Sequence, residues 1–351
     1  MRVLDAPAPS LRYLARLSDQ YGVVEHALLD HPRRDEGYCT DDAGRLLALA
    51  CQVADDPDAK CLARSALAFL ERAHLGGAQF RLRMRGDLSW TSDPASDDAV
   101  GRALLGLGTA VAIAPWEDIR DRSLALFDEA ASFRSPFLHA TAYAALGAVE
   151  VLDRQGDHVG ASQLLEQTST PGSRAMNDEI WPWPEARLRY DNAVIPEASL
   201  ARANSSGDEE SMAGALRQLR WLIEFQTREA HLSFVPVGGV DVTSPLKPQF
   251  DQQPIEAWSC ARGAARAFAL TGEWYWYDTV ERAAAWFLGD NDIGVTMFDE
   301  ETGGGYDGLE SGGVNRNQGA ESSMAFVATM LAWREVGSAH TRDVPGVLAA
   351  Y

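Results

Sequence analysis

The sequence predicts an all-α protein, an (α/α)6 toroid or six-hairpin barrel in which six outer helices surround six inner ones. Two kinds of helical segment alternate along the 351 residues, and the long non-helical stretches come directly before only one kind. Mixed, charged segments should lie outside, whereas segments rich in Ala, Leu and Gly, which are apolar nearly all round, should be buried. We expect a single domain over residues 1–351, because no Pro/Ser-rich linker or block of like charge divides the chain.

The helical segments follow from apolar residues that recur at helical spacing. Charged, mixed segments are expected on the outside at about residues 10–30, 58–74, 117–132, 158–168, 209–228 and 275–288. Small, apolar segments are expected on the inside at about residues 41–54, 97–114, 136–152, 191–204, 253–271 and 319–335. Six of each kind in strict alternation are what an (α/α)6 toroid needs.

Four non-helical stretches are long, at about residues 76–96, 169–190, 229–252 and 289–318, and each precedes an inner segment. Loops longer than about 12–15 residues are usually functional in compact domains. The connections that follow inner segments, such as ADDPDAK and NSSGDEE, are short and polar. We therefore expect one rim to carry elaborate loops, with minor β structure in FRLRMRGDLSW and HLSFVPVGG.

The balance of charge and the absent motifs exclude several classes of function. Thirty-one basic and 51 acidic residues give a formal net charge of −20, which repels nucleic acids and anionic membranes. No apolar run reaches the roughly 18 residues of a membrane span, and the N-terminus lacks the apolar core of a signal peptide. We expect a cytoplasmic protein. No C-x-x-C, H-E-x-x-H or P-loop motif occurs, so we predict neither metal nor cofactor.

The first turns of the inner segments carry most of the chemistry. They read TDDAGR, SDDAVGR, SPFLHA, YDNAVIPEA, DQQPIEA and NRNQGAESS, and five of the six contain carboxylates or carboxamides. In a toroid these turns meet at one end of a central pit. We predict that the following side chains converge there: Asp41, Asp42, Asp97, Asp98, Asp191, Asn192, Gln253, Glu256, Gln318 and Glu321.

Helix capping explains any one of these turns at least as well, because Asp, Ser and Thr are preferred N-caps and Glu256 fits a capping box. The paired Asp residues exceed what a single cap requires. Several carboxylates in one pit also repel one another unless the site uses or binds something. Taken together, the turns favour a functional pit.

Aromatic and polar loop residues extend the predicted site. Aromatic rings in the loops before inner segments suit the faces of sugars, although packing of these loops onto the barrel explains each ring equally well. The Gly-rich stretch at 291–323 is interpreted as a substrate loop. The rings are Trp181, Trp183, Tyr190 and Tyr306, and the loop delivers Asp307, Asn315, Asn317 and Gln318.

Other catalytic plans fit the sequence less well. No G-x-S-x-G elbow is present. The seven histidines are scattered, and only His139 lies near an inner segment's first turn, which disfavours a histidine-based sugar epimerase of the kind that also uses this toroid. The Asp pairs lack the D-D-x-x-D pattern of a terpene cyclase.

The motifs GYCTDDAGRLL, SDDAVGRALLGLG, WPWPEARLRYDNAVIPEASL, QPIEAW and VNRNQGAESS resemble a bacterial family labelled glycosyltransferase or glycosyltransferase-associated. The resemblance covers about residues 20–335 and implies an (α/α)6 toroid similar to six-hairpin glycosidases, with a possible functional link to a glycosyltransferase. No nucleotide-sugar domain is visible, since the chain has no glycine fingerprint. The family's first motif is expected to read D-D-N-A-R; here DDAGR replaces the amide, which removes a sugar contact at position 43.

These observations predict a carbohydrate-active enzyme that cleaves a glycosidic bond, an inverting glycoside hydrolase with one carboxyl as acid and another as base. The candidate acids are Glu256 and Glu321, the candidate bases are Asp42 and Asp98, and Asp191 is held in reserve. The expected partner is an oligosaccharide or glycoside. The substrate-binding set is Asp41, Asp97, Trp181, Trp183, Tyr190, Asn192, Gln253, Tyr306, Asp307, Asn317 and Gln318.

Two alternatives remain open on the same scaffold. A phosphorylase or transferase needs a cationic pocket, which Arg45, Arg102 and Arg316 could supply, although the first two suit neutralisation of the Asp pairs. A non-catalytic glycan-binding partner of a glycosyltransferase would bind sugars without turnover.

Overall fold

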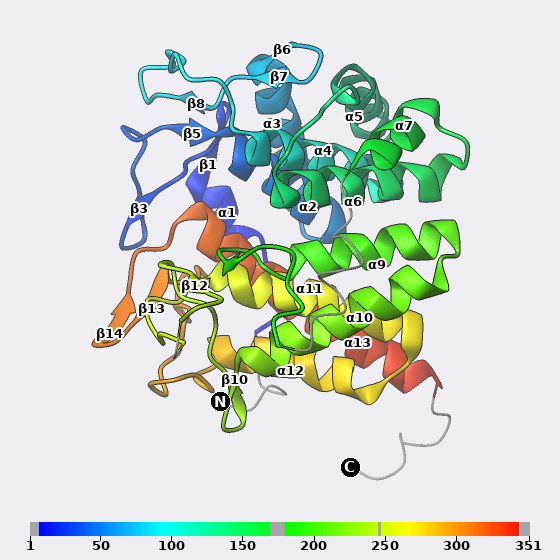
Figure 1. Cartoon of the computed structure of the whole chain (residues 1–351). Helices are drawn as coiled ribbons and strands as arrows, with labels where there is room; N and C mark the ends of the chain where they lie inside the picture. The colour runs from blue at the N-terminus through cyan, green and yellow to red at the C-terminus, as the bar shows by residue number, and fades with distance from the viewer. Residues whose placement is uncertain (1–6, 169–179, 245–246, 344–351) are drawn as a thin grey trace.

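The helices of the computed structural model, which describes residues 7–168, 180–244 and 247–343, form the predicted (α/α)6 toroid. Each inner helix contacts the next, and the last returns to the first, which closes the ring (Figure 1). The inner helices are α2 (Thr40–Gln52), α4 (Asp97–Ile113), α6 (Leu138–Gln155), α9 (Val194–Ser206), α11 (Pro254–Thr271) and α13 (Ala320–Asp343).

The outer helices bury only one face each. In α3 (Ala59–Ala73), for example, Leu62, Phe69 and Leu70 are buried while charged residues face solvent. The other outer helices are α1 (Arg12–Leu17), α5 (Glu117–Ala130), α7 (Val159–Gln167), α10 (Glu209–Phe225) and α12 (Trp274–Phe287). Among the described residues, no helix has both the length and the apolarity that crossing a membrane requires.

Glycines let neighbouring inner helices touch backbone to backbone. A Cβ atom on Gly106 of α4 would lie 2.3 Å from the carbonyl oxygen of Gly44 on α2. A Cβ atom on Gly108 of α4 would lie 2.2 Å from the carbonyl oxygen of Gly147 on α6. Both gaps are far shorter than a van der Waals contact, so the small residues of the inner segments set how tightly the ring closes.

Short antiparallel strand pairs occupy the connections that lead into the inner helices, as predicted (Figure 1). Residues 169–179 of the expected loop at 169–190 lie outside the described part of the chain. The pairs are β1 (Ser18–Asp19) with β2 (Gly22–Val23), β3 (Ala27–Leu28) with β4 (His31–Pro32), β5 (Tyr38–Cys39) with β8 (Arg83–Met84), β6 (His74–Gly76) with β7 (Gln79–Phe80), β9 (Arg187–Leu188) with β12 (Val240–Asp241), β10 (Thr227–Arg228) with β11 (His231–Leu232), and β13 (Gly308–Glu310) with β14 (Gly313–Asn315).

The expected outer helix over 10–30 is wrong beyond α1, which ends at Leu17. The Asp19 side chain accepts a hydrogen bond from the backbone N–H of Tyr21 at 2.9 Å, which forms a local turn. Gly22 follows with a φ of +151°, a conformation that L side chains rarely adopt. Turn chemistry therefore overrides the helical spacing of the apolar residues.

We predict that Gly108→Ala destabilises the fold by about 1–3 kcal/mol, because the added methyl group forces α4 and α6 apart. The matched control is Gly337→Ala on α13, where the added Cβ meets no atom within 4 Å. That change should stabilise by roughly 0.5–1 kcal/mol, since Ala loses less conformational freedom than Gly in a helix. Urea denaturation followed by circular dichroism measures both; equal effects at the two sites would contradict the close-packing account.

Candidate active site

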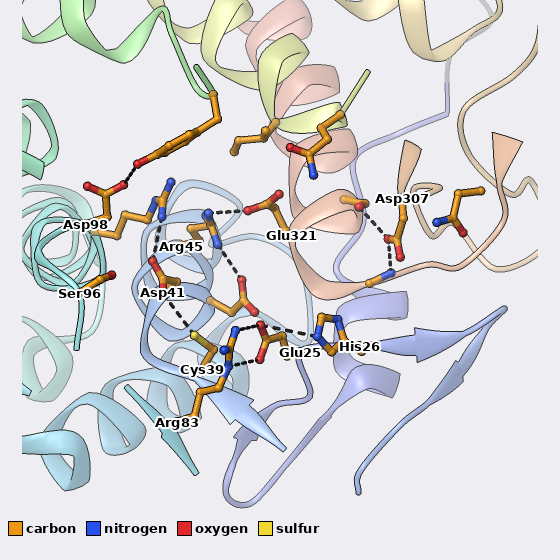
Figure 2. A pocket seen from close by; sticks show the side chains of 18 residues that line it. Glu25, His26, Cys39, Asp41, Arg45, Arg83, Ser96, Asp98, Asp307 and Glu321 are labelled. Carbon is orange, nitrogen blue, oxygen red and sulfur yellow. Dashed lines mark hydrogen bonds and ion pairs between the residues drawn. The ribbon is translucent and has the colours of Figure 1, made fainter. Parts of the chain in front are cut away.

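A cavity of about 570 Å³ lies at the rim where the inner helices begin. Figure 2 shows Asp98 and Asp307 on opposite sides of this cavity, with Arg45 and Glu321 between them. Carboxylates outnumber cations two to one along its walls: Glu25, Asp41, Asp42, Asp98, Asp307 and Glu321 face Arg45, Arg83 and Arg102. The structure brings acidic residues from the first turns of α2, α4 and α13 to this one cavity.

The carboxylates of these first turns are not used as helix caps. The Ser96 hydroxyl caps α4 by accepting a hydrogen bond from the N–H of Ala99 at 3.2 Å. At the start of α2 no side chain caps the helix, and the Thr40 hydroxyl donates to the carbonyl of Arg81 instead. The carboxyls of Asp42 and Asp98 are therefore left to face the cavity.

Arg45 joins carboxyls from two helices. Its side chain is 8% exposed, and its Nη1 donates to Oδ1 of Asp42 at 2.8 Å, one turn earlier on α2. Its Nη2 lies 2.5 Å from Oε2 of Glu321 on α13. These two contacts offset part of the cost of burying the Arg45 guanidinium group and fix the positions of both carboxyls.

Arg102 plays the same part between α2, α4 and α6. Its Nη1 donates to Oδ1 of Asp41 at 2.8 Å, and its Nη2 donates to the hydroxyl of Tyr143 at 2.8 Å. Tyr143 in turn donates to Asp191. Although burial opposes ionisation, Arg102 and then Arg45 hold the pKa of Asp41 below its usual value, so this carboxyl stays charged.

Asp42 has the opposite electrostatic environment. Burial raises the pKa of its carboxyl to about 7. Arg45 opposes this shift, whereas the negative charges of Glu25, Glu321 and Asp41 add to it. Asp42 is consequently protonated in a substantial share of molecules near neutral pH, while its neighbour Asp41 is not.

Asp98 is held by an aromatic side chain rather than by an arginine. The hydroxyl of Tyr190 donates to Oδ2 of Asp98, and the Tyr190 ring lines the cavity. The ring of His139 stacks on Tyr190 with centroids 4.8 Å apart. Burial lowers the pKa of His139, so this histidine supports Tyr190 as a neutral ring and does not line the cavity.

Three of the predicted residues lie deeper than the cavity wall. Glu256 is 2% exposed and accepts hydrogen bonds from the side-chain amide of Asn192 at 3.1 Å and from its backbone N–H at 3.4 Å. Asn192 is itself fully buried. Asp191, at a positive φ of +47°, lines a separate hollow of about 100 Å³ on the barrel axis. Periodicity could not distinguish these depths.

The predicted tryptophans pack onto an outer helix instead of facing the cavity. Trp183 is 3% exposed and stacks on Trp221 of α10, with centroids 6.2 Å apart. Trp181 meets the same ring edge-on at 5.2 Å. Asp97 likewise faces away, toward the α5–α6 connection, where it accepts a hydrogen bond from the hydroxyl of Ser135 at 2.7 Å.

The last loop divides its predicted residues between two cavities. Asp307 and Asn315 line the cavity with the carboxylates, as does Gln253. Tyr306 and Gln318 line a second cavity on the other side of the loop. Asn317, in the wall between them, accepts a hydrogen bond through Oδ1 from the N–H of Leu29 at 2.9 Å.

Glu25, His26 and Arg83 are cavity residues that sequence reasoning missed. Arg83 on β8 binds Glu25 with both Nε, at 2.9 Å, and Nη2. Glu25 lies within the helix expected over residues 10–30, and a helix there does not predict a place for it in the cavity wall. The turn signal around Gly22 could have revealed it.

No group of three or more His, Cys, Asp and Glu side chains is arranged to hold a metal ion within residues 7–168, 180–244 and 247–343. The lining carboxylates are bound instead by arginines and hydroxyl groups. The arrangement can therefore hold a polar, uncharged ligand between hydrogen-bonding groups and supply or accept protons.

Comparison with solved structures finds this toroid in several proteins. A sugar epimerase from a ruminal bacterium matches with a TM-score of 0.69 and 10% identity, over 92% of this chain and 95% of its own. Cellobiose 2-epimerase from Bacillus thermoamylovorans matches with a TM-score of 0.67 and 12% sequence identity, over 92% of this chain and 95% of its own. The cellulase Cel9M of C. cellulolyticium, in complex with cellobiose, matches with a TM-score of 0.61 and 9% sequence identity, over 90% of this chain and 88% of its own. Neither protein-family models nor curated proteins give a match.

Glu256→Gln tests the buried position of that side chain. Gln keeps an oxygen that can accept from Asn192, but it never ionises. Because burial raises the folded pKa of Glu256 from 4.5 to about 8, the wild type loses stability relative to the variant as the pH rises between these values. Denaturant titrations across this range measure the difference, and a difference that does not change with pH would contradict the burial.

Proposed function

We propose that this protein hydrolyses a glycosidic bond, with the protonated Asp42 carboxyl as general acid and the Asp98 carboxylate as base. The observation that carries the proposal is that the carboxyls of Asp42 and Asp98, from the first turns of two inner helices, line the same cavity; burial also raises the pKa of Asp42 to about 7. A carboxyl that keeps its proton near neutral pH is suited to the role of general acid. The sequence predicted Asp42 as a base and Glu256 as an acid. In this proposal Asp42 is the acid, and Glu256 has no catalytic role.

The proposed reaction needs no further reagent than water. Asp42 donates its proton to the glycosidic oxygen as the bond between that oxygen and the anomeric carbon breaks. Asp98 removes a proton from a water molecule whose oxygen forms the new bond to the anomeric carbon, so the configuration inverts. Tyr190 fixes one oxygen of Asp98 and leaves the other for water. Proton exchange with solvent then restores both carboxyls.

Glu321 and Asp307 are better suited to binding sugar hydroxyls. Glu321 is held in place by an ion pair with Arg45 at 2.5 Å. Asp307 accepts hydrogen bonds from the N–H of Gly319 and the hydroxyl of Ser322, both at 2.8 Å. Carboxylates held in this way present fixed acceptors, and Tyr190 presents part of a ring face to the same space.

Phosphorolysis fits this cavity poorly. Each of the three arginines along its wall already binds a carboxylate: Arg45 binds Asp42 and Glu321, Arg83 binds Glu25, and Arg102 binds Asp41. A phosphate dianion would have to displace one of them and meet the remaining negative charge. Arg316, the third arginine considered for a phosphate pocket, lines the other cavity.

Epimerisation of a free sugar is the second candidate, because sugar epimerases are among the similar structures. Proton removal beside a carbonyl needs a base with a pKa near neutrality, and the carboxyl of Asp42 has one. His26 is the only histidine among the described residues that line the cavity, and it is half exposed. A pair of histidines on two sides of a substrate is therefore not formed there.

The link to a glycosyltransferase stays a prediction that rests on the motif resemblance. The cavity would serve a glycan-binding partner as well as an enzyme, but a binding module has no need of a proton donor such as Asp42 in the cavity wall. Turnover decides between these two functions.

We expect Asp42→Asn and Asp98→Asn each to lower kcat by about 100-fold or more, since each removes one proton transfer. The matched control is Asp97→Asn, which changes the neighbouring carboxylate that faces away from the cavity toward Ser135. It should retain most of the activity. In the wild type, kcat/KM should fall as the pH rises through about 7, because Asp42 loses its proton. A rate that rises through this range would exclude Asp42 as the acid.

Product analysis in D2O separates the candidate reactions. Incubation with α- and β-linked oligosaccharides and aryl glycosides, with and without phosphate, should give free sugars with a new reducing end and no deuterium on carbon. The first anomer seen by NMR should have the inverted configuration. Deuterium beside the carbonyl without bond cleavage would instead show epimerisation, a sugar phosphate would show phosphorolysis, and binding without turnover would show a glycan-binding protein.

A further inference from the structure

A second cavity of about 580 Å³ lies beside the first, on the other side of a thin wall. Its walls come from α1, from the turn between β3 and β4, and from the loop that precedes α13. In the wall itself, Leu29 donates its N–H to Oδ1 of Asn317, and Gln318 donates its N–H to the carbonyl of Leu29, both at 2.9 Å. These bonds join the two segments that separate the cavities.

Extended backbone explains why neighbouring residues serve different cavities. Successive side chains of an extended segment point to opposite faces. Asp307 and Asn315 face the first cavity, whereas the adjacent Tyr306 and Arg316 line the second. The second cavity therefore has its own set of side chains and does not extend the first.

Three arginines line this second cavity, and two of them have no acidic partner. Arg12 and Arg16 lie four residues apart on α1, which places them on one side of the helix. Arg16 binds Asp30 at 2.7 Å. Arg12 and Arg316 form no ion pair with any residue in the described part of the chain, whereas every arginine that lines the first cavity does.

Three acidic side chains line the second cavity, and none of them forms an ion pair with Arg12 or Arg316: Asp30 is bound by Arg16, Asp299 is held by its own loop, and Glu301 is exposed. Asp299 is occupied by its own loop: Oδ1 accepts from the N–H groups of Glu301 and Thr302 at 2.9 and 3.0 Å. Its Oδ2 accepts from the hydroxyl of Tyr306 and the amide of Gln318, both at 3.4 Å. The bond from Asp299 also fixes Tyr306, whose half-buried ring lies along the cavity wall.

We propose that this cavity binds an acidic sugar, with Arg12 and Arg316 contacting its carboxylate or phosphate group and Tyr306 contacting the sugar ring. A guanidinium group matches carboxylate and phosphate oxygens with paired hydrogen bonds. In a protein with a formal charge of −20, two arginines without acidic partners in one cavity form a local site for an anion. Binding there is independent of the reaction proposed for the first cavity.

Isothermal titration calorimetry of the full chain tests this site with glucuronate, inorganic phosphate and glucose as probes. Glucuronate should bind, and glucose should bind at least about tenfold more weakly, because it lacks the charge that the arginines contact. Phosphate binding without glucuronate binding would assign the site to phosphorylated sugars and also supports the proposal. Added salt should weaken anion binding.

Arg316→Gln and Arg12→Gln should each weaken anion binding by about tenfold. Both side chains are exposed and lie on separate elements, so circular dichroism should show unchanged folding. The matched control is Arg217→Gln on the exposed side of α10, which should bind like the wild type. Failure of both anions to bind, or binding that neither cavity variant weakens, would overturn the proposal.

Discussion

Two buried arginines allow the acidic ends of the inner helices to lie together. Arg45 binds Asp42 on its own helix and Glu321 on α13, and Arg102 binds Asp41 across the gap between α4 and α2. Without these cations, closing the ring would bring like charges together in a space with little water. Glycine contacts hold α2, α4 and α6 close together. The ring can therefore close only if the arginines neutralise the carboxylates at the starts of these helices.

The arginines do not neutralise every carboxyl near this end of the ring, and this affects the protonation of Asp42. Arg45 is shared between two carboxyls, and Asp42 is the more deeply buried of them, so its carboxyl keeps a proton at a pH where an ordinary aspartate has lost it. Asp41, the preceding residue, forms an ion pair with Arg102, which lowers the pKa of its carboxyl although burial opposes this, so it stays ionised. The two adjacent aspartates therefore differ in protonation near neutral pH, and the protonated one, Asp42, is the proton donor of the proposed reaction.

The fold was predictable because the ring leaves a simple pattern in the sequence. Inner helices contact other helices on nearly every side, which selects small apolar residues, and outer helices keep a charged face. The first-turn acids Asp42, Asp98 and Glu321 were found for a related reason, since a closed ring brings these turns to one end. The pattern of apolar residues does not show in which direction each side chain points. The sequence therefore could not distinguish Glu256 and Trp183, which are buried, from residues that line the cavity. Glu25 was missed because turn residues interrupt a stretch with helical spacing.

The most direct measurement is a pH titration of the side-chain carboxyl groups by ¹³C NMR, in the wild type and in Asp42→Asn for assignment. We expect the Asp42 carboxyl resonance to move with a midpoint near pH 7, since burial raises its pKa to about 7, and to be absent from the variant. An Asp42 carboxyl that titrates near the ordinary aspartate value of 3.8 would contradict the proposed proton donor.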